Sequence, residues 1–386
     1  MILNEYLASK PLYYEQIDYT RMPRAYESIK KDIRLPKIIQ VIGTNGKGST
    51  GRFLANMLLQ KGLSIGHYTS PHIFRFNERI WLNGKDVDDD ILEKMHEKLQ
   101  NLLSSKFLNT LSYFEYTTFL AILIFSQNCD FIVLEAGLGG EFDATTVFPK
   151  VLSIVTPIGY DHSSFLGNTI EEIATTKLNS ITQAALLSPQ YEEIVYKVAK
   201  NIAKKKSCKL YLTQDMITDK DKSEIKRAIK EKNLSLFQEI NLQTALSASK
   251  ILGFDIDLQK VDLSTLVGRC QKVAKNITID VGHNEMAART IVKCFKDRKV
   301  VLVYNSFADK DYKKILETLF PIIKRVEVLH IENPRKTSQK EIKDLCKEMK
   351  IETRDFKNID DDEEYLVFGS FVVVEEFMKD YEGEIN

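Results

Sequence analysis

The sequence predicts an α/β protein with two domains, each built around its own β-sheet. Three observations support this prediction. The chain has 386 residues, which is more than a single hydrophobic core usually organises. A strand, a glycine-rich loop and a helix follow one another between residues 37 and 58. A second alternation of strands and helices starts near residues 263–271, so we place the domain boundary close to Thr265.

The composition excludes several functional classes. Lysine plus arginine and aspartate plus glutamate number 54 each, so the net charge does not indicate a nucleic-acid or membrane partner. The five cysteines are scattered without a CxxC pair, which favours reduced thiols over disulfides or a zinc site. The N-terminus has no signal-peptide pattern, and no apolar run is long enough to cross a bilayer. We expect a cytoplasmic protein that binds neither nucleic acid nor membranes, and we expect a monomer.

The first domain starts with a strand, a loop and a helix. Residues 37–41 form an apolar, β-branched run that predicts a strand, and the segment GTNGKGST follows at residues 43–50. Apolar residues at helical spacing begin at Phe53, and a second strand at 64–68 completes a βαβ unit. The pair Asn83-Gly84 between two short apolar runs indicates a hairpin.

The rest of the chain continues the alternation of strands and helices. The run DFIVLE at residues 130–135 ends on a single carboxylate and predicts a buried parallel strand. Further strands are predicted at 151–155, 276–280, 299–304, 325–329 and 365–368. Helices are predicted at 89–104, 116–127, from Thr169 onward, and at 190–205, 242–252, 286–295, 313–320 and 339–349. The acidic run at 360–364 is expected to be a solvated loop.

The segment GTNGKGST has the features that a phosphate site needs. Its glycines let the chain curl closely around an anion, and the following helix directs backbone N–H groups at it. Lys47 can reach the β- and γ-phosphate oxygens, and Ser49 or Thr50 can hold Mg²⁺. The strict P-loop pattern ends in G-K-[ST], whereas Gly48 separates Lys47 from Ser49 here. A generic P-loop kinase or motor ATPase therefore fits poorly, and a glycine-rich turn without phosphate is the structural alternative.

This variant loop resembles that of the Mur-type amino-acid ligases and, among them, the folylpolyglutamate synthase/dihydrofolate synthase family. The resemblance covers most of the chain, because further segments match the family's motifs in the same order. Thr146 departs from the motif, where the family has asparagine. The matching segments are Ser70-Pro71-His72 with Asn77-Glu78-Arg79, Tyr113–Thr118, Glu135–Gly140 with Phe142–Thr145, Asp161-His162, Gly268-Arg269-Cys270-Gln271, Asp280 with Gly282-His283-Asn284, and Asp309-Lys310-Asp311.

The resemblance implies a fold and a reaction. The fold would be a P-loop-containing, Mur-ligase-like central domain at residues 1–264 and a smaller, Rossmann-like C-terminal domain at 265–386. The reaction would be the ATP-dependent addition of L-glutamate to 7,8-dihydropteroate, to the glutamate tail of reduced folates, or to both. In this family the substrate carboxylate attacks the γ-phosphate of ATP, and the glutamate amine then attacks the resulting acyl phosphate. The cofactors would be ATP and Mg²⁺, with the metal at two sites.

The resemblance also assigns residues to ATP and to the metal. Lys47, Lys177 and His162 would be catalytic. The nucleotide-binding residues would be Thr44, Asn45, Gly46, Lys47, Gly48, Ser49, Asn241, Arg269, Asp280 and His283. The metal ligands would be Ser70, Glu135, His162, Ser49 and, if its side chain is carbamylated, Lys177. A histidine ligand would be unexpected for Mg²⁺, which prefers oxygen, so this assignment depends on the family alone.

Each of these assignments has a structural alternative. Glu135 could cap the glycine-rich segment that follows it, and His162 could be a hydrogen-bonded structural histidine. Lys177 could be a solvated helix lysine, because the residues around it differ from the family's usual motif. Asn241, which precedes the helix predicted at 242–252, could be its N-cap residue.

The pterin-bearing substrate would meet an aromatic surface with nearby carboxylates. The resemblance gives this role to Ser112, Tyr113, Phe114 and Glu115, together with Phe142, Asp143 and Ala144. Aromatic pairs are also common in cores, so a packing role for Tyr113 and Phe114 is the alternative. The segment Asp18-Tyr19-Thr20 differs from the family's usual motif at a position where family members contact the substrate.

Two other functions remain alternatives. A Mur-type ligase of cell-wall precursors would share the loop and the chemistry, but residues 113–118 and the GLGG–DAT segment favour the folate enzymes. A non-catalytic nucleotide-binding module would have no need of Lys47, Glu135 and Lys177 together.

Overall fold

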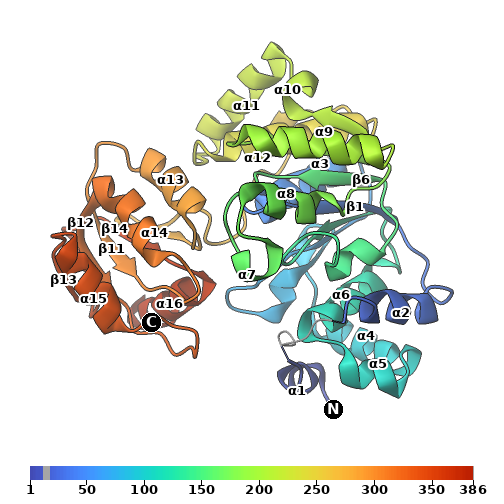
Figure 1. Ribbon diagram of the computed structural model, residues 1–386, viewed down its shortest axis with the longest axis horizontal. Helices are drawn as coiled ribbons and strands as arrows, with labels where there is room; N and C mark the ends of the chain where they lie inside the picture. Colours follow the sequence, from blue (N-terminus) through green and yellow to red (C-terminus); the bar gives the residue numbers. More distant parts are fainter. Residues whose placement is uncertain (12–17, 386) are drawn as a thin grey trace. The chain divides into compact units, whose positions relative to one another are not determined.

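The chain divides into two compact units in the computed structural model, which describes residues 1–11 and 18–385 (Figure 1). The first unit comprises Met1–Leu234 and Gln238–Ser264, and the second comprises Ser235–Phe237 and Thr265–Asn386. Each unit has its own β-sheet. Within the described residues, no helix has the length and apolar character needed to cross a membrane.

An eight-stranded sheet forms the centre of the first unit, with the order β4-β3-β2-β5-β1-β6-β7-β8. The strands from β2 to β8 in this order run parallel, and the hairpin strands β3 and β4 extend one edge antiparallel. The strands are β1 (Lys37–Ile42), β2 (Ile65–Tyr68), β3 (Ile80–Leu82), β4 (Lys85–Asp86), β5 (Phe131–Glu135), β6 (Leu152–Val155), β7 (Ala184–Leu187) and β8 (Lys209–Leu212).

Helices cover both faces of this sheet because its central strands are apolar on both sides (Figure 1). On β1, Ile38 packs with α6, whereas Ile39 and Val41 pack with α3 and α12. The helices are α1 (Leu3–Ala8), α2 (Arg21–Ile29), α3 (Lys47–Gln60), α4 (Asp89–Leu102), α5 (Ser105–Thr110), α6 (Tyr113–Phe125), α7 (Ser163–Leu166), α8 (Ile170–Leu178), α9 (Glu193–Lys205), α10 (Thr213–Met216), α11 (Asp219–Glu231) and α12 (Gln238–Ile251). Short 3₁₀ helices are η1 (Phe76–Arg79), η2 (Ala144–Val147) and η3 (Leu258–Lys260).

The carboxyl ends of four adjacent parallel strands bring the predicted site segments of this unit together. The strand pairs β2–β5, β5–β1 and β1–β6 are each in parallel register, with Val41 opposite Glu135 and Ile42 opposite Val155. The glycine-rich segment, Ser70, Glu135 and the segment leading to His162 follow these four strand ends. Open α/β sheets bind their ligands at this edge.

The second unit has a six-stranded sheet with the order β13-β12-β11-β14-β10-β9, in which only β9 is antiparallel among the described strands. Its strands are β9 (Gln271–Ala274), β10 (Ile277–Asp280), β11 (Val300–Tyr304), β12 (Ile323–Val328), β13 (Thr353–Asp355) and β14 (Tyr365–Phe368). Its helices are α13 (Glu285–Cys294), α14 (Tyr312–Leu319), α15 (Gln339–Glu348) and α16 (Phe371–Ile385), with the 3₁₀ helix η4 (Phe320–Ile322).

Three local predictions need correction. The helix predicted at 116–127 starts at Tyr113, because Ser112 and Glu115 form a capping box there. The helix predicted at 242–252 starts at Gln238, so Asn241 lies inside α12 and is not its N-cap. The acidic run is a loop, but Glu363 in it is held by Lys324 and Arg325.

Candidate active site

The glycine-rich segment between β1 and α3 is shaped by two glycines with positive φ. Gly43 has φ +143°, and a β-carbon there would lie 2.0 Å from the hydroxyl oxygen of Thr156. Gly46 has φ +83° and a left-handed conformation at the N-cap of α3, and a β-carbon there would lie 2.5 Å from Oδ1 of Asn241. Both positions therefore require glycine for backbone and for space.

The backbone of this segment divides into an anchored half and a half available to an anion. The N–H groups of Thr44 and Asn45 donate to the carbonyl of Pro157, at 2.9 and 3.3 Å. The first N–H groups of α3, from Lys47 onward, have no partner within the helix, so they can receive a phosphate. Nζ of Lys47 donates hydrogen bonds to the carbonyls of Thr44, at 3.1 Å, and Gly43, at 3.4 Å.

Asn241 lies against this loop from α12. Its Oδ1 accepts a hydrogen bond from Thr50 at 3.3 Å, and its amide nitrogen donates to Gln238 at 2.8 Å. The structure therefore brings Asn241 to the phosphate segment, although the two are far apart in sequence.

Lys177 connects the phosphate segment to the GLGG segment. It is fully buried near the end of α8, and its Nζ donates to the carbonyls of Gly43 at 3.0 Å and Leu138 at 2.7 Å. Burial, with the neighbouring charge of Lys47, lowers the pKa of Lys177 to about 7. Lys177 is therefore not a solvated helix lysine, because its amine is buried between two loops and half neutral near physiological pH.

Three of the predicted metal ligands, Ser70, Glu135 and His162, lie at or after the carboxyl ends of β2, β5 and β6, whereas Ser49 lies in α3 and Lys177 in α8. Glu135 is the last residue of β5 and is buried, and its Oε2 lies 3.4 Å from the N–H of Ser70. His162 has a positive φ of 50°, and its N–H donates to Asp161. The described residues contain no group of three or more His, Cys, Asp or Glu side chains arranged to hold a metal. A metal here would therefore use the Ser70 hydroxyl and phosphate oxygens in addition to Glu135 and His162.

The predicted substrate motif at 112–115 forms the start of α6. Ser112 accepts from the N–H of Glu115, and the Glu115 carboxylate accepts from the N–H of Ser112. The same carboxylate forms a two-point contact with Arg21 of α2, at 2.9 and 3.2 Å. Glu115 therefore caps α6 and connects it to α2, a structural role that the sequence motif did not indicate.

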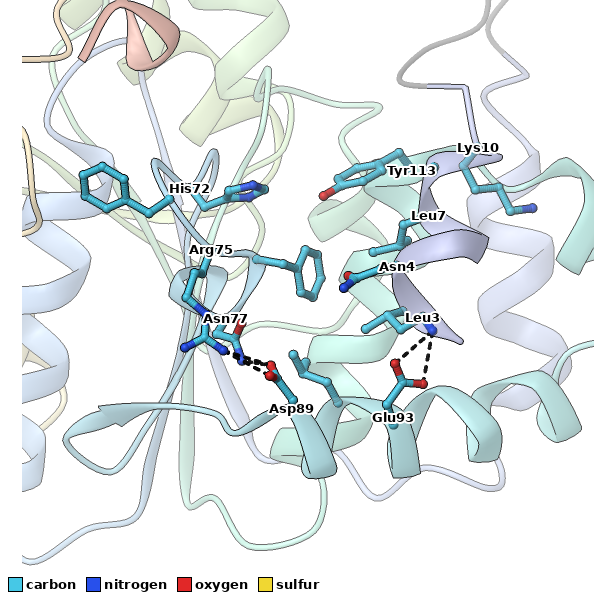
Figure 2. Close-up of a pocket in the computed structure, with 14 residues that line it drawn as sticks. Leu3, Asn4, Leu7, Lys10, His72, Arg75, Asn77, Asp89, Glu93 and Tyr113 are labelled. Atoms are coloured by element: carbon cyan, nitrogen blue, oxygen red, sulfur yellow. Dashed lines mark hydrogen bonds and ion pairs between the residues drawn. The ribbon is translucent and has the colours of Figure 1, made fainter. Parts of the chain in front are cut away.

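The two aromatic residues of this motif face different surroundings. The ring of Phe114 packs against Gly137, where a β-carbon would lie 2.9 Å from the ring. Tyr113 instead lines a cavity of about 780 Å³ beside α1, facing His72 across it (Figure 2). The guanidinium of Arg79 lies 5.3 Å from the Tyr113 ring centre and donates to Nδ1 of His72. Burial lowers the pKa of His72 to about 4, so its imidazole is neutral.

The second substrate segment is a turn stabilised by Asp143. Its Oδ1 accepts from the N–H and hydroxyl of Thr145, and its Oδ2 accepts from the N–H of Gly139 at 3.0 Å. Ala144, buried, begins η2. The neighbouring Phe142 ring is 56% exposed and lies 4.1 Å, between ring centres, from Tyr19. Tyr19 was not among the predicted site residues, although its segment, residues 18–20, lies where the resemblance expects a substrate contact.

In the second unit, Asp280 at the end of β10 is buried and holds a turn. Its carboxylate accepts from the N–H groups of Cys270 at 2.8 Å and Gly282 at 2.7 Å. Burial raises its pKa, and the nearby guanidinium of Arg269 opposes this shift. Arg269 also lies 5.2 Å from the ring of Phe371, and Nδ1 of His283 lies 3.1 Å from the carbonyl of Val281. These three predicted nucleotide contacts thus gather at the carboxyl end of β10.

Comparison with known proteins shows the same architecture elsewhere. No family model matches the chain. A dihydrofolate synthase/folylpolyglutamate synthase from Haemophilus influenzae is 31% identical over 401 residues, which cover 89% of this chain and 88% of the relative. The crystal structure of folylpolyglutamate synthetase from Helicobacter pylori has a TM-score of 0.80 and 38% identity, covering 99% of this chain and 98% of that one. A bifunctional enzyme from Yersinia pestis, solved with Mn, AMPPNP and L-glutamate bound, has a TM-score of 0.82 and 23% identity over 99% and 98% of the two chains, and it shares the fold.

The fold and these relatives define an ATP-dependent ligase. The likeness in sequence extends over nearly nine-tenths of the chain and of the Haemophilus relative. The chain belongs to the dihydrofolate synthase/folylpolyglutamate synthase family.

Proposed function

We propose that this chain joins L-glutamate to the carboxylate of 7,8-dihydropteroate, to the glutamate tail of reduced folates, or to both, with conversion of ATP to ADP and phosphate. The observation that carries the proposal is the position of Lys177, whose Nζ connects the phosphate segment at Gly43 to the GLGG segment at Leu138. This contact places the amine between the loop expected to hold ATP and the segment expected to hold the folate. We propose that the enzyme acts as a monomer.

The nucleotide phosphates would lie at the N-terminus of α3. Lys47, Gly48 and Ser49 supply N–H groups there, and Nζ of Lys47, which lies at the carbonyl of Thr44, supplies a positive charge. Positive groups of this kind neutralise charge that develops on the γ-phosphate as the substrate carboxylate attacks it. The positive φ of Gly46 directs the chain into α3. Because glycine has no side chain, nothing at this position blocks the approach of a phosphate.

Magnesium fits the donor set of the same edge. Glu135 and the hydroxyls of Ser70 and Ser49 are oxygen donors of the kind that Mg²⁺ prefers, and His162 follows the next strand. We propose two Mg²⁺ sites, one nearer Ser49 and one at Ser70, Glu135 and His162. When bound, Mg²⁺ neutralises the phosphate charge. The chain's contribution is to hold Glu135, buried, at the end of β5.

Lys177 has the properties that carbamylation requires. Only an unprotonated amine can attack CO₂, and burial brings its pKa to about 7. The neutral amine adds to CO₂, a C–N bond forms, and one proton leaves, which converts a buried neutral amine into an anion. Starting from the protonated lysine, two protons leave in all. The carbamate nitrogen keeps a single N–H, so one of the two carbonyl contacts of Nζ must then be given up. The negative product would suit a site beside a metal.

The folate would bind at the Asp143 turn. Phe142 presents an exposed ring, and Phe114 packs at Gly137 immediately before the turn. A flat ring with N–H donors can stack on such an aromatic surface and donate to a carboxylate. Oδ2 of Asp143 has one protein donor at 3.0 Å, which leaves capacity for a ligand.

The proposal is tested by phosphate release and product mass with ATP, Mg²⁺ and L-glutamate, in separate reactions with 7,8-dihydropteroate and tetrahydrofolate. Turnover of the first substrate alone would identify a dihydrofolate synthase, and turnover of both a bifunctional enzyme. The Lys47→Ala variant should lose turnover while the protein remains folded. Absence of glutamylation of either substrate by the wild type, at substrate concentrations that a relative converts, would overturn the proposal.

A further inference from the structure

A buried polar network lies behind the Asp143 turn. Gln40 is fully buried at the centre of β1, on the same face as Ile38, where the neighbouring side chains are apolar. Its Oε1 accepts from Nζ of Lys150 at 2.6 Å, and its Nε2 donates to the hydroxyls of Thr145 and Thr146, each at 2.8 Å. Lys150 itself is only 6% exposed. Two costly polar groups are therefore buried together under one turn.

The direction of the hydrogen bonds in this network is fixed by chemistry. A lysine amine beside an amide donates to it, so the oxygen of Gln40 must face Lys150 and its NH₂ group must face the two threonines. The Thr145 hydroxyl then uses its own hydrogen on Oδ1 of Asp143, at 2.7 Å. The Thr146 hydroxyl uses its hydrogen on the carbonyl of Gly140, at 3.0 Å. Donors thus run from Lys150 through Gln40 to both ends of the turn.

This chain of donors determines which Asp143 oxygen is left for a ligand. Oδ1 accepts two hydrogen bonds from Thr145, through the N–H at 3.0 Å and the hydroxyl, and is used up within the protein. Oδ2 accepts only from the N–H of Gly139. Because Oδ1 is held, the carboxylate cannot rotate freely, and Oδ2 keeps one orientation.

We propose that Lys150 and Gln40 are positioning residues that orient Asp143 for the N–H groups of the substrate's flat ring. They touch neither substrate nor nucleotide and act through Thr145 and Thr146. This inference rests on the proposed function, because it takes the Asp143 turn as the place where the folate binds. A network that fixes this turn sets the affinity for the folate and leaves the affinity for ATP, which binds at α3, unchanged.

Thr146, where the family's motif has asparagine, is part of the network. A threonine hydroxyl can accept from Gln40 and donate to Gly140 at the same time. We therefore treat Gln40, Thr146 and Lys150 as one set, in which loss of one member removes most of the effect of the others.

The test uses the full-length enzyme and compares Lys150→Met with wild type. Methionine keeps most of the volume and removes the donor. We expect the KM for the folate substrate to rise about tenfold, which corresponds to about 1.4 kcal/mol. The kcat and the KM for ATP should stay within about twofold, a change too small to reflect a lost hydrogen bond. Gln40→Met should give the same pattern, and the double variant should be no worse than the more severe single one.

A matched control is Lys250→Met, in the same unit. Lys250 is also partly buried, and its Nζ binds the carboxylate of Asp221 and the carbonyl of Met216. Its loss should lower the melting temperature without raising the KM for the folate. If Lys150→Met does not fold, Thr146→Val decides the question, because Thr146 is only half-buried and its replacement breaks the same network.

Two results would overturn the inference. One is a KM for the folate that stays within about twofold of wild type in Thr146→Val and in any folded Lys150 variant. The other is an equal rise in the KM for ATP. Calorimetric binding of 7,8-dihydropteroate without ATP is measured on the same variants. This measurement separates the positioning role from the proposed ligase function. Weaker binding of 7,8-dihydropteroate by the variants supports the positioning role even if the wild type joins no glutamate. Unchanged binding rejects the positioning role.

Discussion

The phosphate segment after β1 and the Asp143 turn after β5 follow neighbouring strands of one sheet, but they are held in different ways. The phosphate segment is shaped by its own backbone, through positive φ angles at Gly43 and Gly46 and hydrogen bonds to Pro157. The Asp143 turn is held by side chains, some of them distant in sequence, such as Gln40 and Lys150. The first loop therefore depends mainly on the backbone conformation of its glycines, whereas the second depends mainly on side-chain hydrogen bonds.

This difference predicts how substitutions should affect the conformation of each loop. A single β-carbon should disrupt the first loop, because glycine is required for its backbone and for space. Loss of one side chain should weaken the second by degrees, because the turn keeps its remaining hydrogen bonds.

Gly43→Ala should abolish nucleotide binding. The added β-carbon would lie 2.0 Å from the Thr156 hydroxyl, at a φ of +143° that disfavours any side chain. Titration with ADP should show no measurable affinity, and turnover should fall at least about 10³-fold. The control is Gly62→Ala, which has φ +76° and no atom within 4 Å of the added carbon. The control should lose only about 1 kcal/mol of stability and keep its activity; nucleotide affinity retained in Gly43→Ala would contradict the contrast.

Lys177→Met should lower turnover by at least about 10²-fold while the protein stays folded. The variant removes the amine that connects Gly43 to Leu138, and with it any carbamate, but retains an unbranched side chain of similar length. Steady-state kinetics at several bicarbonate concentrations would check this. Wild-type turnover should increase with bicarbonate and the variant's should not. Full activity in the variant would show that Lys177 only fills space.

Lys150→Met should also change how stability depends on pH. Burial lowers the pKa of Lys150 from about 10.5 to about 8, so between these values the unfolded chain binds more protons than the folded one. The wild type therefore gains stability relative to the variant as pH rises from 8 to 10.5, by up to about 1.4 kcal/mol per pH unit. Urea unfolding of both proteins across this window would measure the difference. A difference that stays constant with pH would mean that the amine is not buried as described.

The smallest effect should come from the more exposed of two N-terminal ion pairs. Arg24 and Asp18 are about half exposed, so Arg24→Ala should change stability by less than about 1 kcal/mol. Arg21 and Glu115 are both largely buried, so Arg21→Met should cost more, about 3 kcal/mol, because it leaves the Glu115 carboxylate buried without its cation. Thermal unfolding of the two variants gives both values. Equal losses would show that Arg21 does not support the start of α6.

The sequence predicted the backbone-determined parts well. The α/β fold, the strand–loop–helix at the phosphate segment and the family follow from local patterns, and the comparisons confirm the fold and the family. The site residues remain assignments. The geometry brings Lys47, Asn241 and Lys177 to one sheet edge, which a pattern of spacing alone could not show.

The side-chain networks were not predictable in the same way. Gln40 left one signal, a single polar residue in the apolar strand KIIQVI, but nothing in its neighbourhood pointed to Lys150. The motif at 112–115 predicts a substrate surface, and that assignment stays a prediction, but its sequence did not indicate that Glu115 binds Arg21 and caps α6. Helix starts were misplaced at Tyr113 and Gln238, because a capping box or an added first turn extends the helix beyond its apolar run.

If ATP activates a folate carboxylate as an acyl phosphate before glutamate is joined to it, one carboxylate oxygen must leave with the phosphate. The reaction is run with 7,8-dihydropteroate or tetrahydrofolate carrying a heavy-oxygen-labelled carboxylate, and the label is followed by mass spectrometry of the released phosphate. We expect one labelled oxygen in phosphate for every amide bond formed, and none with Lys47→Ala. Amide formation with the label retained outside phosphate, or label found in a nucleotide monophosphate, would contradict activation as an acyl phosphate.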